Sequence, residues 1–184
     1  MKLMLIGSPG SGKSTLARQI QLATGWPLMN LDYYWHQTDY SMVAKKHFDF
    51  QQNEFMLAHP HHWIIDGNYG ATMDTRMRHA DAIIWLQVPR AVAVKRVLAR
   101  SYQTRVHHQQ RADMAPDFSE HLDRDYWDFV KFVWNFPERN RQAIPELAHR
   151  YAPQTPLLLV GQRDKAALLA KIQAGTLLDF PDRI

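Results

Sequence analysis

A glycine-rich run directly after an apolar segment constrains this chain most strongly. Residues 7–14 read Gly-Ser-Pro-Gly-Ser-Gly-Lys-Ser, follow the apolar residues Leu3–Ile6, and match G-x-x-x-x-G-K-[ST] at every fixed position. Glycines allow positive φ, so that backbone N–H groups converge on phosphate oxygens at the N-terminus of the next helix. A plain glycine-rich turn does not explain the Lys13-Ser14 pair. The run therefore predicts a strand, a phosphate-binding loop and a helix in succession.

Each position of this loop has an expected role. Lys13 reaches the β- and γ-phosphates of a nucleotide, the Ser14 hydroxyl ligates Mg²⁺, and Thr15 begins the helix. We expect ATP as the nucleotide, and GTP is equally compatible because no base-specificity motif follows the last predicted strand. The residues expected to contact the nucleotide are Gly7, Ser8, Pro9, Gly10, Ser11, Gly12, Lys13, Ser14 and Thr15.

Short apolar runs alternate with helix-like stretches along the 184 residues. This alternation is typical of an α/β fold, a parallel sheet covered by helices on both faces. The predicted strands are Leu3–Ile6, Leu28–Leu31, Trp63–Ile65, Ala82–Gln87 and Leu157–Val160.

The predicted helices lie between these strands. The first is closed by Gly25, a second spans Asp49–Ala58, and a third opens at Pro89. A strongly aromatic helix follows, with Trp127 and Trp134 on one core-facing side. The remaining boundaries are an end at Pro137 and an N-cap at Asp164.

The length predicts a single domain, and two stretches without clear periodicity predict its functional excursions. These stretches are Tyr33–Lys46 and Gln103–Pro116. In open α/β sheets, long connections at the carboxyl ends of strands form the ligand crevice. We therefore expect a substrate-binding insertion at about residues 33–60 and a helical lid region at about residues 101–137.

Composition excludes several classes of protein. The chain has no cysteine, so it has neither a disulfide framework nor a cysteine metal site. The spacing of the ten histidines does not favour structural zinc. No apolar run approaches 18 residues and the N-terminus reads as a core strand, so we expect a cytoplasmic protein without a membrane partner.

Two carboxylates follow neighbouring predicted strands. Asp32 comes after the second strand and Asp66 directly after the third, so both are expected in the crevice beside the phosphate loop. We expect Asp66 to join Ser14 at Mg²⁺ and Asp32 to orient or deprotonate an acceptor hydroxyl. An alcohol acceptor needs such a base, whereas an acceptor phosphate needs cations. The expected substrate-binding residues are Asp32, Tyr33, Tyr34, Trp35, Asp66, Gly67, Asn68 and Tyr69.

Residues 7–14, the run Trp63–Tyr69 and the pair Arg96 and Arg100 resemble the adenylate kinase-like group of P-loop phosphotransferases. The resemblance implies a five-stranded parallel sheet of order 2-3-1-4-5 in a three-layer sandwich. It also implies that Arg96 and Arg100 clamp the transferring phosphoryl group.

A closer resemblance, from residue 1 to about residue 172, is to the DNA topology modulation (FlaR-related) proteins. It is carried by three motifs, Asp66–Tyr69, Arg111–Ala115 and Trp134–Pro137. Arg105 and Arg111 both fall in the expected lid region, about residues 101–137. We expect closure of the lid to bring one of them to the phosphates.

One departure from adenylate kinases concerns the acceptor side. Those enzymes follow the third-strand Asp-Gly with Phe-Pro-Arg, and that arginine binds the acceptor phosphate, whereas Asn68-Tyr69-Gly70 stands here. Arg76 and Arg78 are the alternatives for this contact. The aromatic run Tyr33–Trp35 suits stacking on a base or sugar, and equally suits a small core under the loop.

These observations leave three functions open. The first is a phosphotransferase acting on a small-molecule or nucleotide acceptor, with catalytic residues Lys13, Asp32, Arg96 and Arg100. The second is a nucleotide-dependent nucleic-acid binder that uses the basic segment Arg90–Arg111, which holds six cations and no acidic residue. The third is a plain NTPase. The sequence leaves the oligomeric state open.

Overall fold

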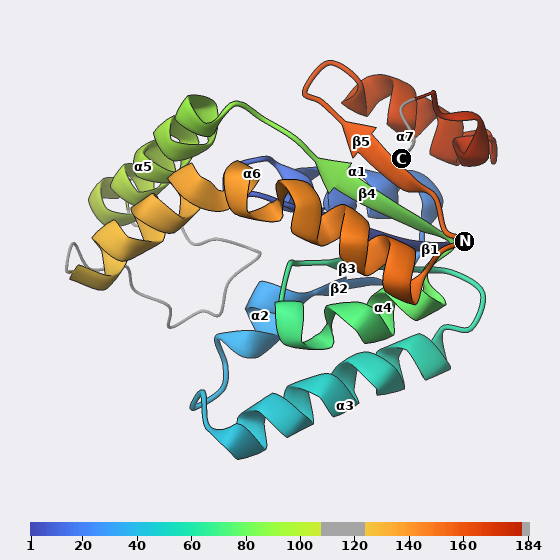
Figure 1. Cartoon of the computed structure of the whole chain (residues 1–184), viewed down its shortest axis with the longest axis horizontal. Coiled ribbons are helices and arrows are strands. Elements are labelled where there is room, and N and C mark those ends of the chain that lie inside the picture. Colours follow the sequence, from blue (N-terminus) through green and yellow to red (C-terminus); the bar gives the residue numbers. More distant parts are fainter. Residues whose placement is uncertain (108–123, 182–184) are drawn as a thin grey trace.

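A parallel five-stranded sheet forms the centre of the molecule (Figure 1). The computed structural model describes residues 1–107 and 124–181. The strand order is β2-β3-β1-β4-β5, as expected from the sequence. The strands are β1 (Lys2–Gly7), β2 (Leu28–Asn30), β3 (Trp63–Asp66), β4 (Ala82–Leu86) and β5 (Leu157–Val160).

The register brings the carboxyl ends of three strands to one edge. Leu5 of β1 lies beside Asp66 of β3, and Asn30 of β2 pairs with the same Asp66. On the other side of β1, Gly7 pairs with Leu86 of β4. Because every pair is parallel, the segments that follow β1, β2 and β3 begin close together, where parallel sheets bind ligands.

Helices cover both faces of the sheet. Apolar residues of α1 and α7 pack in one core cluster, and those of α3, α4 and α6 pack in a second cluster on the opposite face. No helix within residues 1–107 and 124–181 is both long and apolar enough to cross a membrane. The helices are α1 (Lys13–Thr24), α2 (Leu31–Trp35), α3 (Met42–Ala58), α4 (Met73–His79), α5 (Arg90–His107), α6 (Arg124–Tyr151) and α7 (Lys165–Gln173), with short 3₁₀ turns η1 (Gly70–Thr72) and η2 (Leu177–Asp179).

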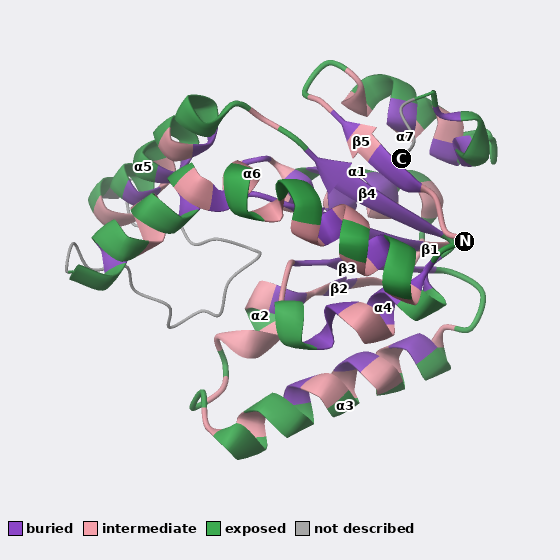
Figure 2. Cartoon of the chain, viewed as in Figure 1, coloured by how far each residue is buried: buried purple, intermediate pink, exposed green. Residues whose placement is uncertain are grey.

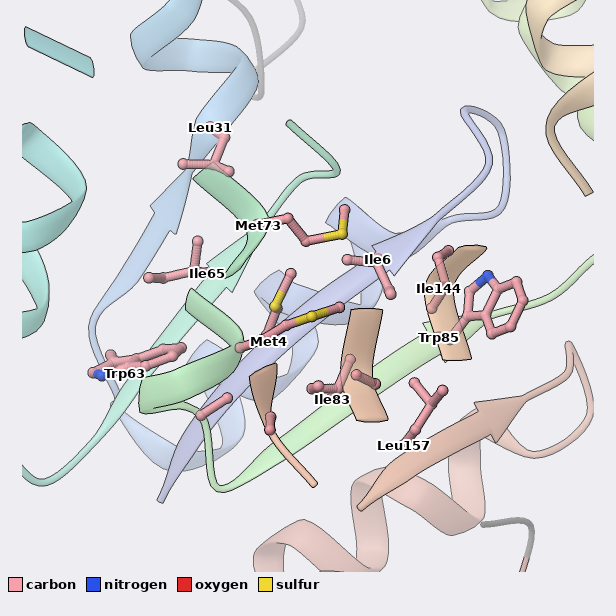
Figure 3. Close-up of a cluster of buried hydrophobic side chains, with 14 of the residues drawn as sticks. Met4, Ile6, Leu31, Trp63, Ile65, Met73, Ile83, Trp85, Ile144 and Leu157 are labelled. Atoms are coloured by element: carbon pink, nitrogen blue, oxygen red, sulfur yellow. The ribbon is translucent and has the colours of Figure 1, made fainter. Parts of the chain in front are cut away.

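The strands are buried on both sides, which explains their nearly uninterrupted apolar sequences (Figure 2). Alternate residues of β1 serve opposite faces: Met4 and Ile6 join the cluster under α4 and α6, while Leu3 and Leu5 face α1 and α7. Figure 3 shows the first of these clusters, in which methionines and Trp63 fill the space between the sheet and the helices.

Helix α3 begins earlier than the sequence predicts. It starts at Met42, not at Asp49, so part of the segment expected to be aperiodic is helical. The Ser41 hydroxyl caps this helix by accepting a hydrogen bond from the Ala44 N–H at 3.1 Å. The early turns were missed because their apolar residue Val43 is exposed, which obscures the helical period.

Helix α6 does not end at Pro137, contrary to the prediction. It continues to Tyr151 through Pro137 and Pro145. An interior proline costs a helix about 3 kcal/mol. Burial of a large apolar side chain stabilises by about 1.5–3 kcal/mol, and Val133, Phe136 and Ile144 are all buried along this helix. Packing against the core therefore outweighs the helix-breaking tendency.

The prediction for the apolar residues of α6 is right in part. Tyr126 and Val133, which the sequence placed among the apolar residues of this helix, are buried. Trp127 and Trp134 are 52% and 45% exposed, so the prediction that they pack in the core is wrong. Val133 packs against Ala93 and Val97 of α5, in a separate small cluster.

Candidate active site

The loop between β1 and α1 has the backbone that the glycine pattern predicts. Gly10 has φ 79° and Gly12 has φ 84°, both in the left-handed region. A Cβ on Gly10 would stand 2.5 Å from the Ala93 carbonyl oxygen of α5, so no larger residue fits there. The loop therefore lies directly against α5 at Gly10. Its backbone conformation there is one that favours glycine.

Cationic side chains hold the carbonyl groups of this loop. Arg96 Nη1 donates to the Gly10 carbonyl at 3.2 Å, and Lys165 Nζ donates to the Ser11 carbonyl at 3.0 Å. Arg96 also bonds Gln162 Oε1 at 3.0 Å. Partial burial, together with the charge of Arg96, lowers the pKa of Lys165. These two cations fix the loop from the side of α5 and α7.

Lys13 is the first residue of α1 and is only 8% exposed. Within residues 1–107 and 124–181, its ammonium group has no hydrogen bond or ion pair. Most of the side chain is enclosed while its ammonium group stays unpaired within these residues, and an anion placed at the loop would give this group a charged partner. The geometry suits the phosphate-binding role that the sequence predicts for this lysine.

Asn68 connects the loop after β3 to the phosphate loop. Its Oδ1 accepts from the Gly7 N–H at 3.0 Å, and its Nδ2 donates to the Gly7 carbonyl at 2.9 Å. This two-bond pairing satisfies both backbone groups of Gly7 at the point where β1 ends. The two predicted halves of the site are therefore joined directly.

Arg76 shapes the segment after β3. The side chain is completely buried, and its guanidinium donates to the carbonyls of Gly67 at 2.7 Å, Asn68 at 2.7 Å and Tyr69 at 2.8 Å. Burial lowers the pKa of Arg76, against the opposing charges of Asp66 and Asp74.

Neither alternative for an acceptor-phosphate arginine is placed for that contact. Arg76 is committed to backbone carbonyls, and the Arg78 guanidinium lies 4.7 Å from the centre of the Tyr151 ring. Sequence spacing does not reveal that an arginine nine residues after Gly67 turns back onto that glycine's carbonyl.

Asp32 lies at the second position of α2 and is partly exposed. Its N–H is held by Asn30 Oδ1 at 3.1 Å, and its Oδ1 accepts a hydrogen bond from the Tyr69 hydroxyl at 2.8 Å. Tyr69 has φ 28°, a conformation uncommon for a residue with a side chain. Burial, followed by the neighbouring Asp32 charge, raises the pKa of Tyr69, so the phenol remains a donor at neutral pH.

The aromatic run after β2 divides into two kinds of residue. Trp35 packs against Phe48 and Tyr69, with ring centres 5.2 and 6.0 Å away, as part of the core under the loop. Tyr34 is partly buried and Tyr33 is 39% exposed. For Trp35 the structure therefore matches the small-core alternative.

The predicted lid arginines lie along α5. Arg96 contacts the phosphate loop as described, and Arg100 is partly buried one turn further along. Arg105 Nε donates to the Ser101 carbonyl at 3.2 Å, and its guanidinium lies over the Tyr126 ring of α6. Arg111 lies outside the described residues.

A cavity of about 510 Å³ adjoins the phosphate loop on the side of α6. Its lining includes Ser8 of the loop, Trp85 at the end of β4, and Arg90, Phe136 and Arg141 of α5 and α6. The sequence offered Arg139 or Arg141 as an arginine that points back at the nucleotide, with an exposed helix arginine as the alternative, and of these two Arg141 lines the cavity. It did not single out Arg90 as a site residue.

The Mg²⁺ expected with the nucleotide fits the donors at this edge. Asp66 is almost completely buried at the end of β3, where its Oδ2 accepts from Asn30 Nδ2 at 3.4 Å. Ser14 is the second residue of α1. One carboxylate and one hydroxyl, completed by phosphate oxygens and water, are a usual Mg²⁺ environment. No group of three His, Asp or Glu side chains suited to a metal occurs among the described residues.

No protein-family model and no curated protein matches this chain. Solved structures match along nearly its whole length. A shikimate kinase from Acinetobacter baumannii with bound shikimate aligns with a TM-score of 0.56 and 14% identity, over 97% of this chain and 93% of that one. A deoxyadenosine kinase from M. mycoides with bound dATP aligns with a TM-score of 0.50 and 13% identity, over 94% and 98% of the two chains.

An inferred kinase from Chloroflexus aurantiacus aligns with a TM-score of 0.59 and 17% identity, over 94% of this chain and 96% of that one. At such identities the likeness concerns the fold. The chain has the parallel α/β fold, with strand order 2-3-1-4-5, that is found in P-loop kinases.

Proposed function

We propose that this protein is a phosphotransferase that moves the γ-phosphoryl group of ATP to a small-molecule or nucleotide acceptor. One observation carries the proposal: the glycine loop lies at the same sheet edge as Asp32 and Asp66, and its buried Lys13 has no partner among residues 1–107 and 124–181. Asn68 ties that loop to the segment after β3. The kinase fold of the similar structures supports the same reaction class.

Each residue then has a chemical task. The amides of Gly10 and of Gly12–Thr15, together with the Lys13 ammonium, bind the polyphosphate, while Asp32 orients the acceptor. Arg96 acts through the shape of the loop, because its guanidinium bonds the Gly10 carbonyl. Arg100, with Arg105 or Arg111, neutralises charge that develops on the transferring group. Positioning and electrostatics supply most of the catalysis in phosphoryl transfer.

Mg²⁺ held by Ser14 and Asp66 would neutralise phosphate charge when the nucleotide is bound. The cavity beside Ser8 extends the proposed site, since Arg141 brings a further cation close to the phosphate loop, while Arg90 in the same lining is paired with Glu138. ATP is the proposed nucleotide, and GTP fits the same loop. We place the protein in the cytoplasm.

The resemblance to DNA topology modulation proteins suggests nucleotide-dependent DNA binding as the second candidate. The basic segment of α5 would form the contact surface. In the structure, however, several of its cations are engaged within the protein: Arg90 pairs with Glu138 at 3.6 Å, and Arg96 bonds the phosphate loop. This use of the charges favours the kinase.

Two measurements separate the candidates, and ADP release is the first. A kinase releases ADP only slowly without an acceptor and faster with one, while a plain NTPase releases ADP at the same rate in both cases. DNA binding through the phosphate backbone would weaken steeply as salt is raised. Steeply salt-dependent DNA binding without acceptor-stimulated ADP release would contradict the proposed function.

A further inference from the structure

The residues after β3 indicate which kind of acceptor the site can bind. This inference rests on the proposed function. Asp32 is framed by the stretches 30–41 and 66–76, and within them Arg76 is the only lysine or arginine. An acceptor phosphate carries up to two negative charges and needs cationic partners at its site. Whether these segments can bind an acceptor phosphate beside Asp32 therefore depends on whether the Arg76 guanidinium is free.

Arg76 is not available to a ligand. Its side chain has no exposed surface, and besides the three loop carbonyls its Nε donates to the Thr72 carbonyl at 3.3 Å. Turning this guanidinium toward an acceptor would take the donor away from the buried Gly67 carbonyl and from the partly buried Asn68 carbonyl, which is strongly unfavourable. Residues 30–41 and 66–76 therefore contain no lysine or arginine that is available to bind an acceptor phosphate.

The same segment supplies what an alcohol acceptor requires. Tyr69 donates its hydroxyl hydrogen to Asp32 Oδ1 at 2.8 Å, which fixes the carboxylate and leaves Oδ2 as the acceptor for another proton. The Tyr69 carbonyl accepts from Arg76 Nη2 at 2.8 Å and from the Thr72 N–H at 3.1 Å, and these two bonds hold the backbone that has the unusual φ of 28°. Arg76 therefore acts on the carboxylate indirectly, through the conformation of Tyr69.

We propose that the acceptor is an alcohol that bears no phosphate group, and that Tyr69 is the positioning residue for its base, Asp32. The acceptor oxygen forms a bond to the γ-phosphorus while the bond from that phosphorus to the bridging oxygen of ADP breaks. The hydroxyl proton passes to the Asp32 carboxylate, and the electron pair of the broken bond remains on ADP. Arg76 is a structural cation of this loop and does not bind the acceptor.

The test supplies the whole protein with γ-¹⁸O-labelled ATP, Mg²⁺ and a small-molecule cell extract, and reads the labelled products by mass. Products whose only phosphate is the labelled one are expected. A labelled diphosphate made from a monophosphate would overturn the inference and leave the proposed phosphotransferase intact. No labelled product, with ATP still bound, would contradict phosphoryl transfer itself, and the inference would fall with it.

A variant then tests the positioning role. Tyr69→Phe should lower kcat about ten- to a hundredfold, the value of a hydrogen bond to a charged group, and leave the KM for ATP unchanged. Tyr151→Phe, on the far end of α6, is the matched control and should keep wild-type kcat. Equal kcat in Tyr69→Phe and wild type would overturn the role of Tyr69, and so would a loss that appears only as a raised KM for ATP.

Discussion

Two loops at neighbouring strand ends are shaped by different means. In both, cationic side chains bind backbone carbonyls: Arg96 and Lys165 do so for the loop after β1, and Arg76 does so for the loop after β3. The first loop also depends on glycines at fixed positions, while the second contains Tyr69 in a strained conformation. The conformation of the loop after β1 follows from its own glycines. The conformation of the loop after β3 depends on Arg76, a residue of the next helix, α4.

This difference has a functional counterpart. A glycine-rich loop at a helix N-terminus presents backbone amides that suit an anion such as a polyphosphate. A loop held by a distant guanidinium keeps its backbone fixed while its side chains, Asn68 and Tyr69, reach the two halves of the site. We therefore expect the second loop to be the more sensitive to a single substitution.

Replacing Arg76 is the most severe way to test that expectation. Arg76→Met should lower the free energy of unfolding by about 4 kcal/mol, because the Gly67 and Asn68 carbonyls lose this charged donor and the Tyr69 carbonyl keeps only its bonds from Thr72. Urea unfolding measures the change. Arg78→Met is the matched control and should cost less than about 1 kcal/mol, the range of a single cation–π contact. If the free energy of unfolding falls equally in the two variants, Arg76 does not stabilise the loop after β3.

Replacing Lys13 tests the first loop through its chemistry. Lys13→Ala should reduce kcat about a hundred- to a thousandfold, because a positive charge at the phosphates is lost from a water-poor site. Its melting temperature should not fall, since the lysine is buried without a protein partner in the described structure. Steady-state kinetics and thermal melting give both values. Exposed Lys45→Ala should match wild type, and a folded Lys13→Ala with full activity would refute the assignment.

Two glycine substitutions test whether α5 constrains the loop after β1. Gly10 and Gly175 have similar φ, 79° and 72°, but a Cβ would meet the Ala93 carbonyl only at Gly10, with nothing near it at Gly175. Gly10→Ala should lower stability by about 2–3 kcal/mol and weaken ATP binding about tenfold. Gly175→Ala should cost about 1 kcal/mol and leave ATP affinity unchanged. Denaturant unfolding and calorimetry distinguish them, and identical behaviour would show that α5 does not constrain the loop.

The smallest expected effect is a pH dependence in the second loop. Because burial and the Asp32 charge raise the pKa of Tyr69, the folded protein keeps this phenol protonated above pH 10, where the unfolded chain ionises. Stability from this group is complete below pH 10 and is lost above it, by about 1.4 kcal/mol per pH unit. Wild type should lose stability faster than Tyr69→Phe between pH 10 and 11. Parallel slopes in urea unfolding would contradict the buried hydrogen bond.

Much of the fold was predictable because its signals are local. The five strands are nearly uninterrupted apolar runs, and the predicted limits of Leu157–Val160 agree with the structure. Gly25 ends α1 in the left-handed conformation, as predicted. Asp164 precedes α7 as expected, yet its carboxylate accepts from the Gly161 N–H and not from a helix N–H.

The errors lie where packing overrides local preference. Pro137 stays inside α6 because the helix packs on the sheet beyond it, and α3 begins early under an exposed apolar residue. The site divides in the same way. The glycines and Lys13 follow from a pattern, whereas the contacts of Arg76, Lys165 and Asn68 join segments that no spacing rule brings together.

Calorimetric titration with ATP and Mg²⁺ tests the central claim most directly, because everything proposed requires a polyphosphate bound at residues 7–15. Wild type should bind with a Kd between about 1 µM and 1 mM, the usual range for an enzyme and its substrate. Lys13→Ala should bind at least about tenfold more weakly. Absence of heat from wild type, or equal affinity in the two proteins, would contradict the account.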